Sequence, residues 1–272
     1  MDRQILKDKV IILIGASGGL GKVFAEEFAA EGAVVVMTGR NKAKLKEAAK
    51  EIEAKGGEVF PLVADFKKKE DAPRVCQTVL EKYGKFDALV TNASRTGDCV
   101  SIEVCDDDYI DDIIDTDVKG LLRYNREAMK HFLERDDGII LNIGSNNIGR
   151  PICDAVYCAA KYAEWGLTRQ MAMRCVGTGV RCNLLNPGSF PSNTSVDVAS
   201  GASHMYDAGE KVQASGILPV VNGSMVDIMK ARTNRAVPVD LKQVAYAAIY
   251  LISDLAKNVN GQMFTVDRGG YM

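Results

Sequence analysis

Short apolar runs alternate with longer amphipathic stretches along nearly the whole chain. The runs are rich in Val, Ile and Leu and have the length of β-strands, whereas the longer stretches repeat their apolar residues at helical spacing. We expect strands at 10–14, 33–37, 58–64, 86–90, 138–143, 180–185 and 263–266. We expect helices at 20–30, 41–55, 72–83, 106–133, 155–176 and 241–253. Because the predicted strands are apolar on both faces, the pattern indicates a parallel sheet covered by helices on both sides.

The alternation also bears on the number of domains. A length of 272 residues allows one large domain or two small ones. Because strands and helices alternate almost to the end, we predict a single doubly wound α/β domain of the Rossmann type over residues 1–272, with a mostly seven-stranded parallel sheet. The stretch 188–235 is rich in Ser, Gly, Asn and Asp and has weak periodicity. A segment of that length in a compact domain is typically functional, so we expect a substrate lid there.

Composition excludes several classes of partner and site. Hydrophobic residues make up 47% of the chain and charged residues 26%, which argues against intrinsic disorder. The formal net charge of −2 supplies no general attraction to nucleic acid or anionic membrane, so no nucleic-acid partner is expected. The apolar run 10–14 is too short for a signal peptide or a membrane span. Seven Cys without a CxxC pair and only two His predict no metal site and a reducing, cytoplasmic location.

A glycine-rich turn, Gly15-Ala-Ser-Gly-Gly-Leu-Gly21, joins the first predicted strand to the first predicted helix. Glycines let backbone N–H groups approach a pyrophosphate closely, and the helix N-terminus adds the positive end of its dipole. Since a second strand follows this helix, the context predicts a dinucleotide site rather than a purely structural turn. The expected contacts from this turn are Gly15, Ser17, Gly18, Gly19, Leu20 and Gly21.

The end of the second predicted strand bears on the choice between NAD(H) and NADP(H). NAD sites carry an acidic residue here for the ribose 2′-hydroxyl, whereas NADP sites place an arginine for the 2′-phosphate. The sequence has no acid at this point, and Gly39 is followed by Arg40. A guanidinium can bind a phosphate through two hydrogen bonds, so NADP(H) is favoured over NAD(H). The alternative for Arg40 is a solvated cation in a loop.

Tyr157 and Lys161 are four residues apart on a predicted helix, so their side chains share one face. A nearby ammonium favours phenolate over phenol, which would lower the pKa of the tyrosine and let it transfer a proton. Ser145 follows the strand predicted at 138–143 and can hydrogen-bond a substrate oxygen. In isolation, a Tyr/Lys pair on a helix usually only lies on the protein surface. In combination with the glycine turn, the pair becomes a specific signal of a catalytic site.

The order of these motifs resembles the classical short-chain dehydrogenase/reductase family over essentially the whole chain. The glycine turn resembles that family's Thr-Gly-x3-Gly-x-Gly motif, and Ser145 with Tyr157-x3-Lys161 resembles its catalytic motif. Residues 91–94 (Thr-Asn-Ala-Ser) are similar to its Asn-Asn-Ala-Gly segment, and residues 186–188 (Asn-Pro-Gly) to its Pro-Gly segment. Residues 261–262 and 267–270 resemble its C-terminal strand motif.

The resemblance implies hydride transfer between a nicotinamide cofactor and a ketone or secondary alcohol. It implies that Tyr157 is the acid in reduction and the base in oxidation, and that Lys161 lowers the pKa of Tyr157 and holds the nicotinamide ribose. Ser145 would orient and polarise the substrate oxygen, and Asp65 would contact adenine. The further cofactor contacts that the resemblance implies are Phe66, Asn92, Ala93, Tyr157, Lys161, Pro187 and Gly188.

Asp117 departs from the family pattern, which usually has Asn at this position. In the family that residue stabilises a helix kink, and its backbone carbonyl holds a water that connects to the lysine. A backbone role survives the change to Asp. A carboxylate near Lys161 can also pair with it and change its pKa, so we expect Asp117 to belong to the catalytic group and the pH profile to be unusual.

Substrate choice is open in the sequence. Asn147, two residues after Ser145, is either a substrate contact or a turn former, and Phe190 is an expected substrate contact from the lid. The apolar residues of 188–235 suit either a bulky hydrophobic substrate, steroid-like or acyl, or a subunit interface. A 3-oxoacyl-thioester reductase is the alternative enzyme, and a non-catalytic dinucleotide sensor or scaffold is the alternative from another class. The resemblance also implies a homodimer or homotetramer formed through the helices at 106–133 and 155–176.

Overall fold

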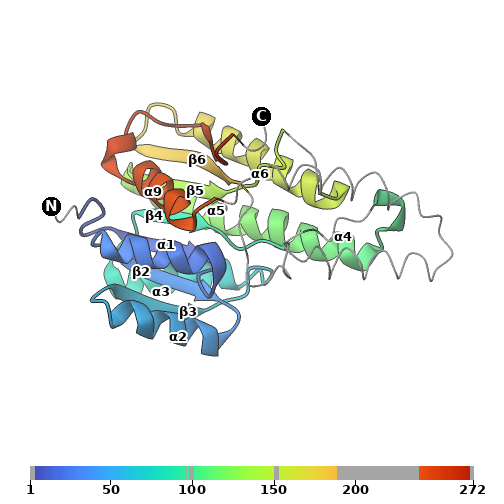
Figure 1. The fold of residues 1–272 in the computed structure, drawn as a ribbon. Coiled ribbons are helices and arrows are strands. Elements are labelled where there is room, and N and C mark those ends of the chain that lie inside the picture. The colour runs from blue at the N-terminus through green and yellow to red at the C-terminus, as the bar shows by residue number, and fades with distance from the viewer. Residues whose placement is uncertain (1–3, 96, 98–100, 150–152, 189–238, 270–272) are drawn as a thin grey trace.

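The computed structural model describes residues 4–95, 97, 101–149, 153–188 and 239–269. Within them seven parallel strands form one sheet in the order β3-β2-β1-β4-β5-β6-β7. The arrangement confirms the doubly wound α/β fold expected from the sequence (Figure 1). The strands are β1 (Val10–Ile14), β2 (Val34–Gly39), β3 (Glu58–Val63), β4 (Ala88–Thr91), β5 (Gly138–Ile143), β6 (Val180–Pro187) and β7 (Met263–Val266).

Helices cover both faces of the sheet. Those named α1, α2 and α9 pack on one face, and α3, α5 and α6 pack on the other (Figure 1). The strands β1, β4, β5 and β6 are buried along their whole length, which explains why they are apolar without alternation. The helices are α1 (Gly19–Ala30), α2 (Lys42–Glu53), α3 (Asp71–Tyr83), α4 (Asp107–Ile113), α5 (Leu121–Arg135), α6 (Ala155–Arg174) and α9 (Leu241–Ile252).

The register of the strands brings distant motifs to one edge of the sheet. Strand β1 pairs with both β2 and β4, so that Ile14 lies level with Thr38 on one side and with Thr91 on the other. After β3 the chain crosses to the opposite side of β1 to form β4, which makes the β1–β4 junction the point where strand order reverses. Ligands of open α/β sheets bind at the carboxyl ends of strands at such a point. The glycine turn and the segments after β2 and β4 all start from this edge.

The helix expected over 106–133 differs from the structure. The chain forms α4, then a π-helical segment over Ile114–Gly120, and then α5 (Figure 1). The widened turns carry Asp117, whose carboxylate is held by groups that follow β4, and Gly120, which lies against Phe66. Periodicity alone does not reveal such a change, because a π-helical insertion shifts the apolar pattern by only one residue. π-Helical segments are frequent at functional sites.

A small separate cluster joins α4 and the π-helical segment to the start of α6. Its buried residues are Ile113, Val156, Tyr157 and Ala160. Tyr157 is thus held by packing on a helix that is itself fixed against the segment carrying Asp117. None of the described helices combines the length and the apolar character that a membrane span requires. Among the described residues, no group of three or more His, Cys, Asp or Glu side chains is placed to hold a metal ion.

Candidate active site

The glycine turn after β1 is shaped by two close approaches of the backbone. Gly15 has φ of 84°, and a Cβ at this position would lie 2.7 Å from the backbone nitrogen of Ala93. A Cβ on Gly21 would collide with the carbonyl oxygen of Gly15. The same carbonyl accepts a hydrogen bond from Nδ2 of Asn92 at 3.0 Å. Asn92 therefore ties the end of β4 to the turn, and only glycine fits at positions 15 and 21.

The start of α1 fits the pyrophosphate of a dinucleotide. Gly18 precedes the helix and supplies no side-chain cap, so the first turn keeps backbone N–H groups that no capping side chain satisfies. No neighbouring atom of the described chain lies within 4 Å of the place where a Cβ of Gly18 or Gly19 would be. Open space, free N–H groups and the helix dipole together make a site for an anion.

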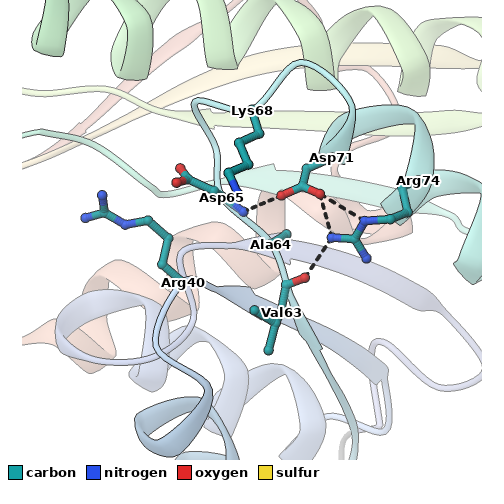
Figure 2. Close-up of a pocket in the computed structure, with 7 residues that line it drawn as sticks. All are labelled: Arg40, Val63, Ala64, Asp65, Lys68, Asp71 and Arg74. Carbon is teal, nitrogen blue, oxygen red and sulfur yellow. Dashed lines mark hydrogen bonds and ion pairs between the residues drawn. The ribbon is translucent and has the colours of Figure 1, made fainter.

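A cavity of about 310 Å³ lies beside this turn at the ends of β2 and β3 (Figure 2). One of its walls is fixed by an ion pair: Arg74 donates to Asp71 Oδ1 from Nε at 2.9 Å and from Nη2 at 2.7 Å. Arg74 also donates to the carbonyl of Val63 at 2.7 Å. The charge of Arg74 is therefore neutralised by Asp71 within the wall of the cavity. The lining residues are Arg40, Val63, Ala64, Asp65, Lys68, Asp71 and Arg74.

Arg40 and Lys68 are the cavity cations that no carboxylate neutralises within the described chain. In Figure 2 the side chain of Arg40 lies across the view from Arg74, and that of Lys68 lies between them. A Cβ on Gly39 would lie 3.2 Å from Oγ of Ser17, so the residue before Arg40 touches the glycine turn. Arg40 is therefore adjacent to the turn, as the sequence predicts, and Lys68 is an additional cation that sequence reasoning did not single out.

Asp65 and Phe66 follow β3, where the family resemblance implies contacts with the cofactor. The backbone nitrogen of Asp65 donates to Asp71 Oδ2 at 2.7 Å, which aligns this stretch with α3. The ring of Phe66 is buried and stacks on Tyr124 with 5.2 Å between ring centroids. Because this ring is buried, Phe66 could contact the cofactor only through its backbone atoms. Asp65 borders the cavity.

Tyr157 and Lys161 project from the first two turns of α6. Asp154 caps this helix and accepts a hydrogen bond from the backbone nitrogen of Tyr157 at 2.8 Å. Both side chains are buried, and Nζ of Lys161 lies 5.5 Å from the centroid of the Tyr157 ring. The shared helix face predicted from their spacing is confirmed.

Ser145 follows β5, and its hydroxyl favours the ionised form of Tyr157. Its Oγ accepts two hydrogen bonds from Asn147, from the backbone nitrogen at 3.2 Å and from Nδ2 at 2.9 Å. The side-chain oxygen of Asn147 in turn accepts from the backbone nitrogen of Cys153 at 3.0 Å. Of the two readings of Asn147, the geometry supports the turn former, because both ends of its amide orient Ser145 and the following loop.

The pKa of Tyr157 departs from the sequence-based expectation. Burial raises it to about 12, while the charge of Lys161 and the hydrogen bond from Ser145 lower it and Asp117 raises it further. Lys161 thus acts in the expected direction but does not decide the net shift, which is upward instead of downward. The reason is that sequence spacing places the ammonium beside the phenol but says nothing about burial or about carboxylates near that ammonium.

Asp117 lies against Lys161, as the family resemblance led us to expect. Its Oδ2 is 3.5 Å from Nζ of Lys161 and accepts a hydrogen bond from Oγ of Ser94 at 2.5 Å. Its Oδ1 accepts from the backbone nitrogen of Arg95 at 2.7 Å. The segment after β4 therefore connects the glycine turn, through Asn92, with the π-helical segment, through Ser94.

Glu164 is a site residue that sequence reasoning missed. Nζ of Lys161 donates to Glu164 Oε2 at 3.1 Å, and only 3% of the Lys161 side chain and 4% of the Glu164 side chain are exposed. Burial raises the pKa of Glu164 to about 7, with Lys161 opposing and Asp117 reinforcing the shift. The available signal was its position three residues after Lys161 on the same helix, which places the two side chains together.

The expected nicotinamide end lies where β6 ends. Gly188 donates its backbone N–H to the carbonyl of Val266 at 2.9 Å, and a Cβ on it would lie 2.8 Å from Cα of Asp267. Within the described chain, the buried Oδ1 of Asn186 has no hydrogen-bond partner. This oxygen faces Gly144 after β5, where a Cβ would collide with it. Of the lid expected over 188–235, Phe190 and all other residues after Gly188 lie outside the described residues.

Comparisons with known proteins agree with this site. The sequence profile of the family described as short chain dehydrogenase matches residues 9–202. The A-factor type gamma-butyrolactone 1'-reductase of Streptomyces virginiae is 30% identical over 98% of both chains. The 3-oxoacyl-[acyl-carrier-protein] reductase of Thermotoga maritima is 27% identical over 97% of this chain and 98% of its own. A crystal structure of an actinorhodin polyketide ketoreductase variant with NADPH matches with a TM-score of 0.81 and 25% identity over the whole of both chains.

The family match covers more than half of the chain, including β1, the glycine turn, Ser145, Tyr157 and Lys161. These relatives are oxidoreductases, and the hydride transfer between a nicotinamide cofactor and a ketone or secondary alcohol that the motifs imply agrees with them. The chain belongs to the short-chain dehydrogenase/reductase family of oxidoreductases.

Proposed function

We propose that the enzyme is an NADPH-dependent ketone reductase in which Tyr157 donates a proton to the substrate oxygen. The observation that carries the proposal is the burial of Tyr157 beside Lys161, with Ser145 acting on the same hydroxyl. A bound nicotinamide would supply the hydride. Ser145 hydrogen-bonds the same oxygen and polarises the carbonyl, and Lys161 holds the ribose and the orientation of Tyr157. Because the pKa of Tyr157 is raised to about 12, the phenol keeps its proton at neutral pH and suits reduction.

Arg40 supports the preference for NADPH. It lies at the cavity by the glycine turn without a carboxylate partner in the described chain, and Lys68 adds a second cation to the same cavity. The polyketide ketoreductase structure also holds NADPH. Asp65 lines the cavity from the segment after β3, which supports a contact with adenine; an acid that binds the ribose 2′-hydroxyl would instead follow β2.

We expect Arg40→Ala to weaken NADPH binding by about 10- to 100-fold and to change NADH binding little, since a charge-assisted hydrogen bond is worth about 1.5–3 kcal/mol. The measurement is the dissociation constant of each cofactor by fluorescence titration. Lys68→Ala is expected to act in the same direction with a smaller effect. Lys46→Ala removes an exposed charge from α2 and serves as the control for net charge. An unchanged ratio of the two constants in Arg40→Ala would refute the assignment.

For the substrate we propose a bulky hydrophobic ketone or secondary alcohol, with a 3-oxoacyl thioester as the second candidate. The A-factor type butyrolactone reductase supports the first class, and the acyl-carrier-protein reductase supports the second. The test is NADPH oxidation followed at 340 nm with cyclic ketones, ketosteroids and 3-oxoacyl thioesters. Turnover of a thioester above all ketones would select the second candidate. No turnover with any carbonyl compound would favour a cofactor-binding protein without catalysis.

We further propose one cytoplasmic domain that assembles as a homodimer or homotetramer. Exposed large apolar side chains on α5 and α6 support the assembly, with Leu122 exposed by 45% and Tyr162 by 46%. Light scattering coupled to size-exclusion chromatography gives the mass directly. A monomer at micromolar concentration would contradict the proposal.

A further inference from the structure

Lys161 lies between two buried carboxylates that come from different helical segments. Its Nζ is 3.1 Å from Oε2 of Glu164 on α6 and 3.5 Å from Oδ2 of Asp117 on the π-helical segment. The side chains of Lys161, Asp117 and Glu164 are exposed by 3%, 1% and 4%. A single ammonium therefore neutralises only one of two carboxylates in a region that excludes water. We call these three residues the lysine cluster.

The two carboxylates of the lysine cluster are not equally stabilised. Asp117 accepts hydrogen bonds from Oγ of Ser94 and from the backbone nitrogen of Arg95, in addition to its contact with Lys161. Within the described chain, the side chain of Glu164 has a hydrogen bond from Lys161 only. A buried carboxylate with fewer donors is the one that holds a proton more readily. Glu164 is consequently the carboxylate of the cluster that is less stabilised in its ionised form.

We propose that Glu164 is a positioning residue that acts through Lys161: its carboxyl group anchors the ammonium beside Tyr157, and its proton sets the charge of the lysine cluster to zero or to −1. The inference rests on the proposed role of Tyr157 as proton donor. The groups that face the lysine cluster are Tyr157 on α6, Asp117 with its donors Ser94 and Arg95, Ser145 after β5 and Cys153 before α6.

The charge of the lysine cluster controls how tightly Tyr157 holds its proton. When Glu164 is protonated, Lys161 and Asp117 cancel, and a phenolate meets no net charge. When Glu164 is ionised, the cluster carries −1 and disfavours a phenolate beside it. Burial places the pKa of Glu164 at about 7, so the change falls in the neutral range. Above that pH Tyr157 is held as an acid, which favours carbonyl reduction over alcohol oxidation.

The first test is thermal unfolding of the cofactor-free protein and of Glu164→Gln between pH 5 and 8. Gln keeps an oxygen for Lys161 but cannot titrate. The raised pKa of Glu164 means that the folded wild type holds a proton between its ordinary value of 4.5 and about 7 that the unfolded chain has lost. The stability from that proton is present at low pH and decreases as pH rises through this window. We therefore expect the melting temperature of Glu164→Gln to rise relative to wild type by several degrees from pH 5 to pH 8.

Asp115→Asn is the matched control for this comparison. Asp115 lies on the same π-helical segment, but its side chain is 37% exposed and paired with Lys119. The hydrogen bond from Lys119 lowers the pKa of Asp115 below its ordinary value, so it stays ionised throughout the tested range. Its melting difference from wild type should be constant with pH. A constant difference for Glu164→Gln as well would show a merely structural role and overturn the proposal.

The second test is the pH profile of kcat/KM for alcohol oxidation, which requires the Tyr157 phenolate. In Glu164→Gln the lysine cluster stays neutral, so we expect the profile to move to lower pH by about one unit, a tenfold gain at a given pH on its rising limb. Asp117→Asn removes the other negative charge and should move the profile the same way, which keeps the test decisive if Glu164→Gln does not fold. A lower kcat with an unmoved profile in either variant would refute the inference. Absence of turnover in the wild type would instead refute the proposed function, while the melting comparison still tests Glu164.

Discussion

Tyr157→Phe is expected to lower kcat for carbonyl reduction by about 10³-fold while the dissociation constant of NADPH changes less than about threefold, since general acid catalysis contributes 10²- to 10⁴-fold. The variant removes the proton that Tyr157 donates and keeps the ring that packs on Ile113 and Val156. Ser145 and Lys161 stay in place, so substrate polarisation and cofactor binding survive. Steady-state NADPH oxidation and fluorescence titration of the cofactor measure the two quantities on the same preparation.

Tyr246→Phe is the control for loss of a tyrosine hydroxyl. Tyr246 lies on α9 and is 47% exposed, so the substitution should change neither kcat nor the melting temperature. Activity of Tyr157→Phe close to that of wild type would show that another group donates the proton. Loss of cofactor binding together with activity would point to a distorted helix α6 instead of a lost acid.

Gly21→Ala is expected to weaken cofactor binding by at least about 100-fold and to destabilise the fold by about 1–3 kcal/mol, as overpacking of a tight site does. The added methyl group would overlap the carbonyl oxygen of Gly15 and lie 2.7 Å from Nδ2 of Asn92. To relieve this overlap, α1 must move away from β1. That movement takes the N–H groups at the start of α1 away from the pyrophosphate of the cofactor. Cofactor titration and chemical unfolding give the two effects separately.

Gly166→Ala provides a matched helical glycine without this overlap. Gly166 lies in α6, and outside its own helix backbone no atom of the described residues is within 4 Å of the position where its Cβ would be. Alanine at such a site should stabilise the helix by about 0.5–1 kcal/mol and leave cofactor binding unchanged. Wild-type affinity in Gly21→Ala would mean that the backbone of the turn does not hold the cofactor.

Much of the fold followed from local pattern. The run predicted at 10–14 is β1, and the helix predicted at 20–30 begins one residue earlier and ends at Ala30. These elements are buried on the faces that their apolar spacing indicates, so periodicity is sufficient to find them. The prediction of one continuous helix over 106–133 was wrong at Ile114–Gly120, where the structure has a π-helical segment. There the carboxylate of Asp117 accepts hydrogen bonds from Ser94 and Arg95, which follow β4. Those donors are distant in sequence and leave no periodic signal.

The sequence by itself determined the parallel sheet, the cofactor turn and the shared face of Tyr157 and Lys161, since each depends on residues within a few positions of one another. Only the tertiary structure decided the electrostatics of the site. It brought Asp117 and Glu164 to the same ammonium, committed Arg74 to Asp71 and left Arg40 unpaired among the described residues. It also buried Tyr157 enough to reverse the expected direction of its pKa shift. Burial and charge pairing are sums over neighbours from separate segments, and such sums exist only once the chain has folded.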